Sequence, residues 1–90
     1  MTFDAGVCSV HGALDFFTAG SVLSSVSEHI AANPQLEINL GGVSDCNSVG
    51  LALMIEWLAT ARREAHSVTF SQIPDSLRQL AVVCQVDTLI

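Results

Sequence analysis

Histidine, cysteine, serine and carboxylate side chains are the groups through which this chain could perform chemistry, and few of them fall into a pattern. The three histidines, His11, His29 and His66, are far apart in the sequence and form no metal-ligand motif. The three cysteines are odd in number and form no CxxC pair, which argues against a zinc ribbon and a disulfide framework. We therefore expect no metal site, no bound cofactor and buried free thiols.

Motifs of known catalytic machinery are missing from the sequence as well. It contains no GxSxG nucleophile elbow, no GxxxxGK[ST] phosphate loop and no GxGxxG turn after a strand. A triad of Ser48 with a histidine and an aspartate could be assembled from the composition, but nothing in the sequence brings such residues together. We therefore predict that the protein is not an enzyme.

Ser48 is the serine whose position favours a function, because it follows a predicted strand and a polar turn and directly precedes a predicted helix. Its hydroxyl is placed to accept a hydrogen bond from the free backbone N–H of Gly50 or Leu51, an N-cap that contributes about 1 kcal/mol. The same helix N-terminus attracts anions, and a hydroxyl there could carry a phosphate group. A structural cap and a regulatory switch are compatible, and the sequence leaves both open.

A row of large apolar side chains starts beside Ser48. Val49, Leu53 and Trp57 recur four residues apart on the predicted helix, about 100 to 140° away from its predicted core stripe. Either a neighbouring helix covers this row, or the row is an exposed aromatic and aliphatic anchor for a protein partner. Self-association of the domain through the same row is a further possibility.

The periodicity of apolar residues predicts the elements that position these side chains. Predicted strands cover residues 7–11, 36–40 and 68–70, and the middle one is expected to bend at Gly41-Gly42. Predicted helices cover residues 18–32 and 49–65, and a third is opened by Ile73-Pro74-Asp75. The inner faces of the second and third helices are expected to hold Leu51, Met54, Ile55, Leu58 and Ala61, and Leu77, Leu80, Ala81 and Cys84. Strands that alternate with helices predict an α/β fold with a mostly parallel sheet.

Composition restricts the chain to one small domain with few classes of partner. Its 90 residues suffice for a single domain, residues 1–90, with one core. A formal charge of −6 repels nucleic acid and anionic lipid surfaces. The N-terminus lacks the pattern of a signal peptide, and no apolar run reaches the roughly 18 residues of a transmembrane helix. We expect a cytosolic domain that does not insert into a membrane.

Three segments carry a resemblance to a known family. Residues 7–15, Val-Cys-Ser-Val-His-Gly-Ala-Leu-Asp, and residues 38–44, Ile-Asn-Leu-Gly-Gly-Val-Ser, are followed by residues 47–53, Asn-Ser-Val-Gly-Leu-Ala-Leu. They resemble the opening strand with its "G-E-L-D" turn, the central strand with its "L-S" step, and the diagnostic "D-S-x-G-L" segment of the STAS domain family. Ala13 replaces the Glu of the first motif. The resemblance spans residues 6–90 and implies a mostly parallel sheet of four strands covered by helices.

The resemblance also implies a function and a set of contact residues. Gly-Leu-Ala-Leu at residues 50–53 is more similar to the MlaB-type subunits of Mla phospholipid-transport ABC systems than to anti-sigma factor antagonists. This implies a cytoplasmic accessory subunit that binds the transporter's ATPase subunit and lies at the inner membrane through that partner. Ser48 falls on the family's regulatory Ser/Thr. The implied partner contacts are Asp45, Asn47, Ser48, Val49, Leu53 and Trp57.

Two alternative functions stay open at the sequence level. The first is an anti-sigma factor antagonist that an anti-sigma kinase phosphorylates at Ser48. Asn47 argues against it, because antagonists carry an aspartate there, and Asp45 is two residues away from the position it would have to fill. The second is binding of a nucleotide or a lipid head group at the same helix terminus. The lack of any Lys or Arg near Ser48 in the sequence argues against that ligand.

Overall fold

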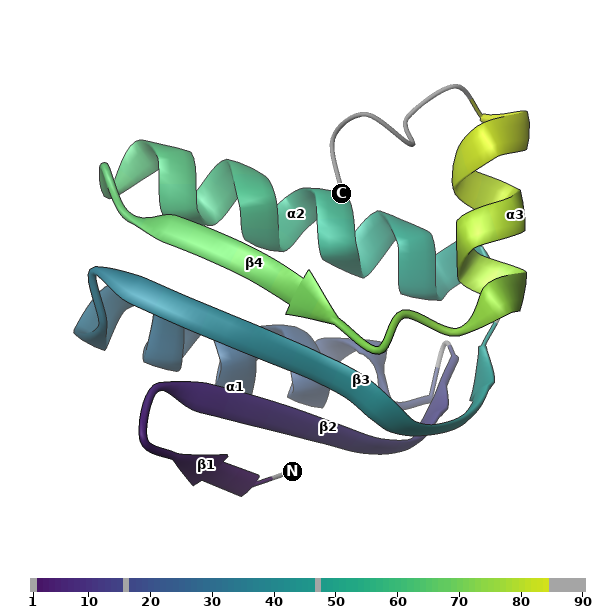
Figure 1. The fold of residues 1–90 in the computed structure, drawn as a ribbon, viewed down its shortest axis with the longest axis horizontal. Coiled ribbons are helices and arrows are strands. Elements are labelled where there is room, and N and C mark those ends of the chain that lie inside the picture. The colour runs from purple at the N-terminus through teal and green to yellow at the C-terminus, as the bar shows by residue number, and fades with distance from the viewer. Residues whose placement is uncertain (1, 16, 47, 85–90) are drawn as a thin grey trace.

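The structure, a computed structural model, describes residues 2–15, 17–46 and 48–84, and at Asp45 and Cys46 it describes the backbone alone. Figure 1 shows a twisted sheet with helices packed against it. The elements in chain order are β1 (Thr2–Asp4), β2 (Val7–Leu14), α1 (Ala19–Ala32), β3 (Gln35–Cys46), α2 (Ser48–Arg63), β4 (Ser67–Ser71) and α3 (Asp75–Val83).

The sheet has the strand order β1-β2-β3-β4. β2, β3 and β4 are parallel, and β1 pairs antiparallel with β2 along the outer edge. The predicted mostly parallel sheet of four strands is therefore confirmed. Parallel neighbours require crossover connections, which α1 and α2 provide between β2 and β3 and between β3 and β4.

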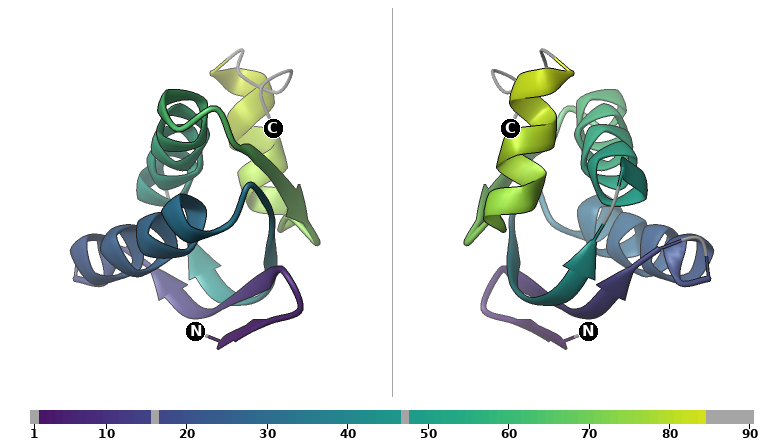
Figure 2. Two further views of the ribbon diagram at one scale, coloured as in Figure 1. Left: turned by 90° about the vertical axis from the view of Figure 1, so that its left-hand side faces the viewer. Right: turned by 90° about the vertical axis from the view of Figure 1, so that its right-hand side faces the viewer.

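One face of the sheet carries the helices, and the other face is polar. Along β2 and β3 the buried side chains alternate with more exposed polar ones such as Ser9, His11, Glu37 and Asn39. Figure 2 shows α1 and α2 together on one side of the sheet. The buried side chains of β2 and β3 are Cys8, Val10, Leu14, Leu36, Ile38 and Leu40.

The buried face of α2 differs from the predicted one. Leu53 and Trp57 belong to the core, whereas Ile55 and Leu58, which were expected there, are half-buried. The reason is tertiary, because α2 packs against α1, α3 and β4 at once, and the helix periodicity does not say which side each neighbour covers. Leu51, Met54 and Ala61 are buried as predicted.

The predicted burial of side chains on α3 and of the cysteine thiols is confirmed at some positions and wrong at others. Leu77 and Ala81 are buried on α3 as predicted, while Leu80 is half-buried. Cys8 is a buried free thiol, which confirms the expectation for that residue. The same expectation is wrong for Cys84, which is exposed, because α3 ends at Val83 and Cys84 lies beyond its last turn.

β3 continues further than predicted, and this extension leads the chain to Ser48. The strand passes through Gly41-Gly42 and ends at Cys46. Its pairing with β2 shifts register between Ser9 and His11, so the expected irregularity at the two glycines is present without ending the strand. A Cβ atom on Gly42 would come too close to the His11 ring and to the Val10 carbonyl oxygen.

Candidate functional site

Two helix N-termini open side by side at one end of the sheet. Leu14 and Cys46, the last residues of β2 and β3, are register partners, and each is followed within a few residues by the start of a helix. Figure 1 shows α1 and α2 starting at this same end of the domain. The carboxyl ends of neighbouring parallel strands are where α/β domains most often place binding groups. We call this region, formed by residues 15, 17, 18, 48 and 49, the strand-end surface.

Ser48 is exposed and is the first residue of α2. It was predicted to cap the helix from the position before Val49, so the helix starts one residue earlier than expected. The first turn of α2 contains no acidic residue, which leaves the partial positive charge of the helix N-terminus without a carboxylate of its own. Among the other predicted contacts, Asn47 lies outside the described residues, and Asp45 is described only as part of the backbone of β3.

The apolar row that begins at Val49 is largely internal. Val49 is half-buried and packs against the core, but Leu53 is only 4% exposed and Trp57 is fully buried. Of the two interpretations of this row, the exposed anchor is therefore wrong for Leu53 and Trp57. Within the described part of the chain, the indole Nε1 of Trp57 is buried without a hydrogen-bond partner, although buried N–H groups are normally paired.

Phe17, for which the sequence predicted no role, is 97% exposed at the strand-end surface. The Asp15 carboxylate accepts hydrogen bonds from the backbone N–H of Phe17 at 2.9 Å and of Thr18 at 3.2 Å. The Thr18 hydroxyl donates to the Ala13 carbonyl oxygen at 2.9 Å and accepts from the Asp15 N–H at 3.1 Å. The signal in the sequence was an aromatic residue between Asp and Thr, two residues that form such local turns.

The segment Gly12-Ala13-Leu14-Asp15 has a structural role at the end of β2. Gly12 has a φ of +82°, a backbone conformation that side-chain-bearing residues rarely adopt. Leu14 is fully buried and fixes the end of β2 in the core. Asp15 then turns the chain towards α1, because its side chain and its carbonyl oxygen both accept hydrogen bonds from the residues that start the helix. The motif is thus a device that positions the strand-end surface.

Metal-ligating side chains were a further kind of group to look for in the domain. Among the side chains that the structure describes, which exclude those of Asp45 and Cys46, no three His, Cys, Asp or Glu residues are close enough to hold a metal ion together. Burial raises the pKa of the Cys8 thiol, which keeps it protonated and inert inside the core. None of the described helices has both the length and the apolar character that a membrane span requires.

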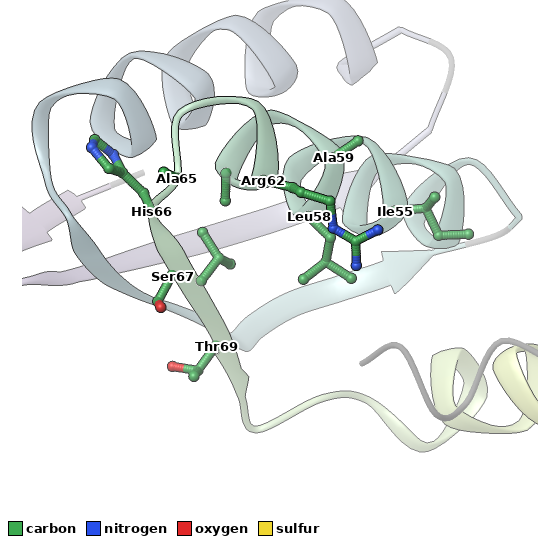
Figure 3. Close-up of a pocket in the computed structure, with 10 residues that line it drawn as sticks. Ile55, Leu58, Ala59, Arg62, Ala65, His66, Ser67 and Thr69 are labelled. Carbon is green, nitrogen blue, oxygen red and sulfur yellow. The ribbon is translucent and has the colours of Figure 1, made fainter.

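A groove lies elsewhere on the domain, between the second half of α2 and β4. Figure 3 shows Ile55, Leu58 and Ala59 along one wall, with the Arg62 side chain reaching over the groove. Val68 and Thr69 of β4 line the other side, and the groove has a volume of about 550 Å³. It contains none of the predicted contact residues. It accounts for the half-buried state of Ile55 and Leu58.

Solved structures with this arrangement identify the class of domain. The anti-sigma factor antagonist SpoIIAA in its unphosphorylated form has a TM-score of 0.68 at 17% sequence identity, over 89% of this chain and 76% of that chain. The STAS domain of a SulP transporter from Vibrio cholerae has a TM-score of 0.64 at 16% identity, over 99% of this chain and 71% of that chain. The fold is therefore that of a STAS domain.

The family follows from the sequence over its whole length. The profile of the STAS_2 family, described as "Mlab, STAS domain", matches residues 1–90. The chain belongs to this family, whose STAS domains generally bind or regulate other molecules rather than catalyse reactions. No curated protein matches the chain.

Proposed function

We propose that this domain is the accessory subunit of an Mla-type phospholipid ABC transporter and that it binds the transporter's ATPase subunit through the strand-end surface. The observation that carries the proposal is the exposed Ser48 at the start of α2 in a chain that matches the Mlab-type family from end to end. In this role the domain lies in the cytoplasm, at the inner membrane, through its partner.

The chemistry of the strand-end surface supports protein binding over catalysis. Ser48 offers a small neutral hydroxyl, and Val49 beside it is half-buried and apolar. Neither side chain brings a charge to this position, which suits the centre of protein interfaces, where charged residues are depleted. Leu53 and Trp57 take part indirectly, because they hold α2 in the core and thereby fix the position of its first turn.

Replacement of Ser48 by glutamate tests the proposal. In the interface the added carboxylate would be desolvated without a partner, so we expect Ser48→Glu to weaken binding to the ATPase subunit at least tenfold, with a smaller loss for Ser48→Ala. A carboxylate in the first turn of α2 interacts favourably with the positive end of the helix dipole, so Ser48→Glu should keep its fold. Binding is measured by isothermal titration with the purified ATPase subunit from the same transporter.

The matched control is Thr69→Ala, at an exposed position on β4 beside the groove. It should bind as the wild type does. Wild-type affinity of Ser48→Glu, or no binding of the wild-type domain to the ATPase subunit, contradicts the proposed function.

The second candidate function is a phosphorylated anti-sigma factor antagonist. The exposed hydroxyl of Ser48 favours it, since a kinase could reach this group at the end of the domain. Asn47 disfavours it, because the antagonists carry an aspartate beside the serine. Incubation with an anti-sigma kinase and ATP, followed by intact-mass measurement, distinguishes the two functions. A gain of one phosphate group that Ser48→Ala abolishes supports the antagonist, and an unchanged mass excludes it.

A further inference from the structure

We infer that Phe17 is the apolar anchor of the strand-end surface and that it inserts into an apolar pocket on the ATPase subunit. The inference rests on the proposed function and adds a residue that neither the Ser48 segment nor the row from Val49 to Trp57 contains. Leu53 and Trp57 are inside the core, so Phe17 takes their place as the large apolar side chain that a partner can reach.

Exposure alone does not carry the inference, because single exposed apolar side chains are common on protein surfaces. Phe17 differs from the other exposed large apolar residues, Phe3, Val82 and Val83, in degree, since 97% of it is accessible against 39%, 60% and 78%. Phe3 is also engaged, because its ring stacks on His29 with the centroids 4.5 Å apart.

The backbone that presents Phe17 is fixed. Its N–H donates to the Asp15 carboxylate, and the next residue, Thr18, is tied to Asp15 and to the Ala13 carbonyl oxygen. Because the backbone is already ordered, binding has to order only the side-chain torsions of Phe17, and less of the contact energy is spent on ordering. Aromatic groups on pre-ordered backbone have the properties of interface hot spots.

Phe17 and Ser48 follow the ends of two neighbouring strands. The chain leaves β2 at Leu14 and β3 at Cys46, which are register partners on adjacent strands about 4.8 Å apart. Phe17 is three residues beyond Leu14 and Ser48 two residues beyond Cys46, so their Cα atoms lie at most about 11 Å and about 7 Å, respectively, from these strand ends. A single partner surface can therefore cover both side chains.

Charge favours a protein pocket over a lipid surface as the site that Phe17 enters. The domain carries a formal charge of −6, and Asp15 stands beside Phe17, whereas two of the three cationic residues, Arg62 and Arg63, are at the opposite end of α2. Insertion of an aromatic side chain into a membrane is normally accompanied by basic residues that attract anionic lipids. None of the residues that form the strand-end surface is basic, and the third cationic residue, Arg78, belongs to α3.

The test compares Phe17→Ser with Phe17→Leu in titrations against the purified ATPase subunit. We expect Phe17→Ser to weaken binding about tenfold or more, and Phe17→Leu to keep most of the affinity because an apolar side chain remains. Neither variant should shift the thermal unfolding midpoint by more than about 1 °C, since Phe17 makes few contacts within the domain. Thr69→Ala again serves as the control.

The outcomes separate this inference from the proposed function. Wild-type affinity of Phe17→Ser together with lost affinity of Ser48→Glu overturns the inference and leaves the proposed function in place. Wild-type affinity of both variants contradicts both. Two further measurements would also overturn the inference: sedimentation of the wild type, but not of Phe17→Ser, with vesicles of phosphatidylethanolamine and phosphatidylglycerol, or a wild-type dimer in ultracentrifugation that Phe17→Ser dissociates.

Discussion

The exposure of individual side chains decides which of them a partner can touch. Ser48 and Phe17 are exposed at the same end of the sheet, whereas Leu53 and Trp57, two residues with the size of typical anchors, are enclosed by the core. A partner could reach Leu53 or Trp57 only by opening the packing between α2 and its neighbours. The described cysteines differ in the same way, and their reactivity towards a thiol reagent measures the difference directly.

We predict that the folded domain reacts with a thiol reagent at Cys84 and not at Cys8. Cys84 is exposed just after α3, while Cys8 is fully buried and burial raises its pKa, so that it has neither access nor thiolate character near neutral pH. Labelling with iodoacetamide followed by peptide mass mapping identifies which cysteine is modified. Labelling of Cys8 at the rate of Cys84 without denaturant would contradict the described core.

At the scale of elements, β3 is the one that delivers Ser48 to the surface. It runs from Gln35 through two adjacent glycines to Cys46, and its pairing with β2 continues to that last residue. A Cβ on Gly42 would lie against the Val10 carbonyl oxygen, 3.0 Å away, and the His11 ring, so backbone as well as side chain would have to move. A Cβ on Gly41 would meet side-chain atoms only: the flexible end of the exposed Gln72 side chain and, 3.0 Å away, the Asn39 Oδ1 atom.

Gly42→Ala is therefore expected to destabilise the domain by about 1–3 kcal/mol, the usual cost of forcing an extra carbon into an occupied space. Gly41→Ala should cost clearly less, because Gln72 can rotate away and the alanine restricts the unfolded chain. Urea unfolding followed by the fluorescence of the single tryptophan, Trp57, gives both free energies. Equal losses for the two variants would show that the close approach of β2 to β3 at Gly42 is not rigid.

At the scale of the whole molecule, the sequence predicts the elements whose pattern is periodic and misses those that depend on contacts. Alternation revealed β2, β3 and β4, and the spacing of apolar residues revealed the three helices. β1 has no such pattern, because its three residues are all exposed and it is held by a tight hairpin. The turn consists of Ala5 and Gly6, both with positive φ, the geometry that two-residue hairpins favour.

The candidate site was predictable only in part for the same reason. The motif around Ser48 is local, so its place at the start of a helix could be read from the sequence. The buried side of α2 is set by α1, α3 and β4 together, so Leu53 and Trp57 could not be assigned to the core or the surface from helix periodicity. Phe17 owes its exposure to a hydrogen-bonded turn between Asp15 and Thr18, which apolar periodicity does not report.

Hydrogen–deuterium exchange of the domain with and without its ATPase subunit tests most directly whether the strand-end surface is the docking site. A partner seated on Ser48 and Phe17 should slow exchange of the backbone amides in residues 15–19 and 48–52, which it would cover at the starts of α1 and α2. The amides along the groove, residues 58–69, should exchange as in the free domain. Protection confined to the groove, with residues 15–19 and 48–52 unchanged, would contradict the account.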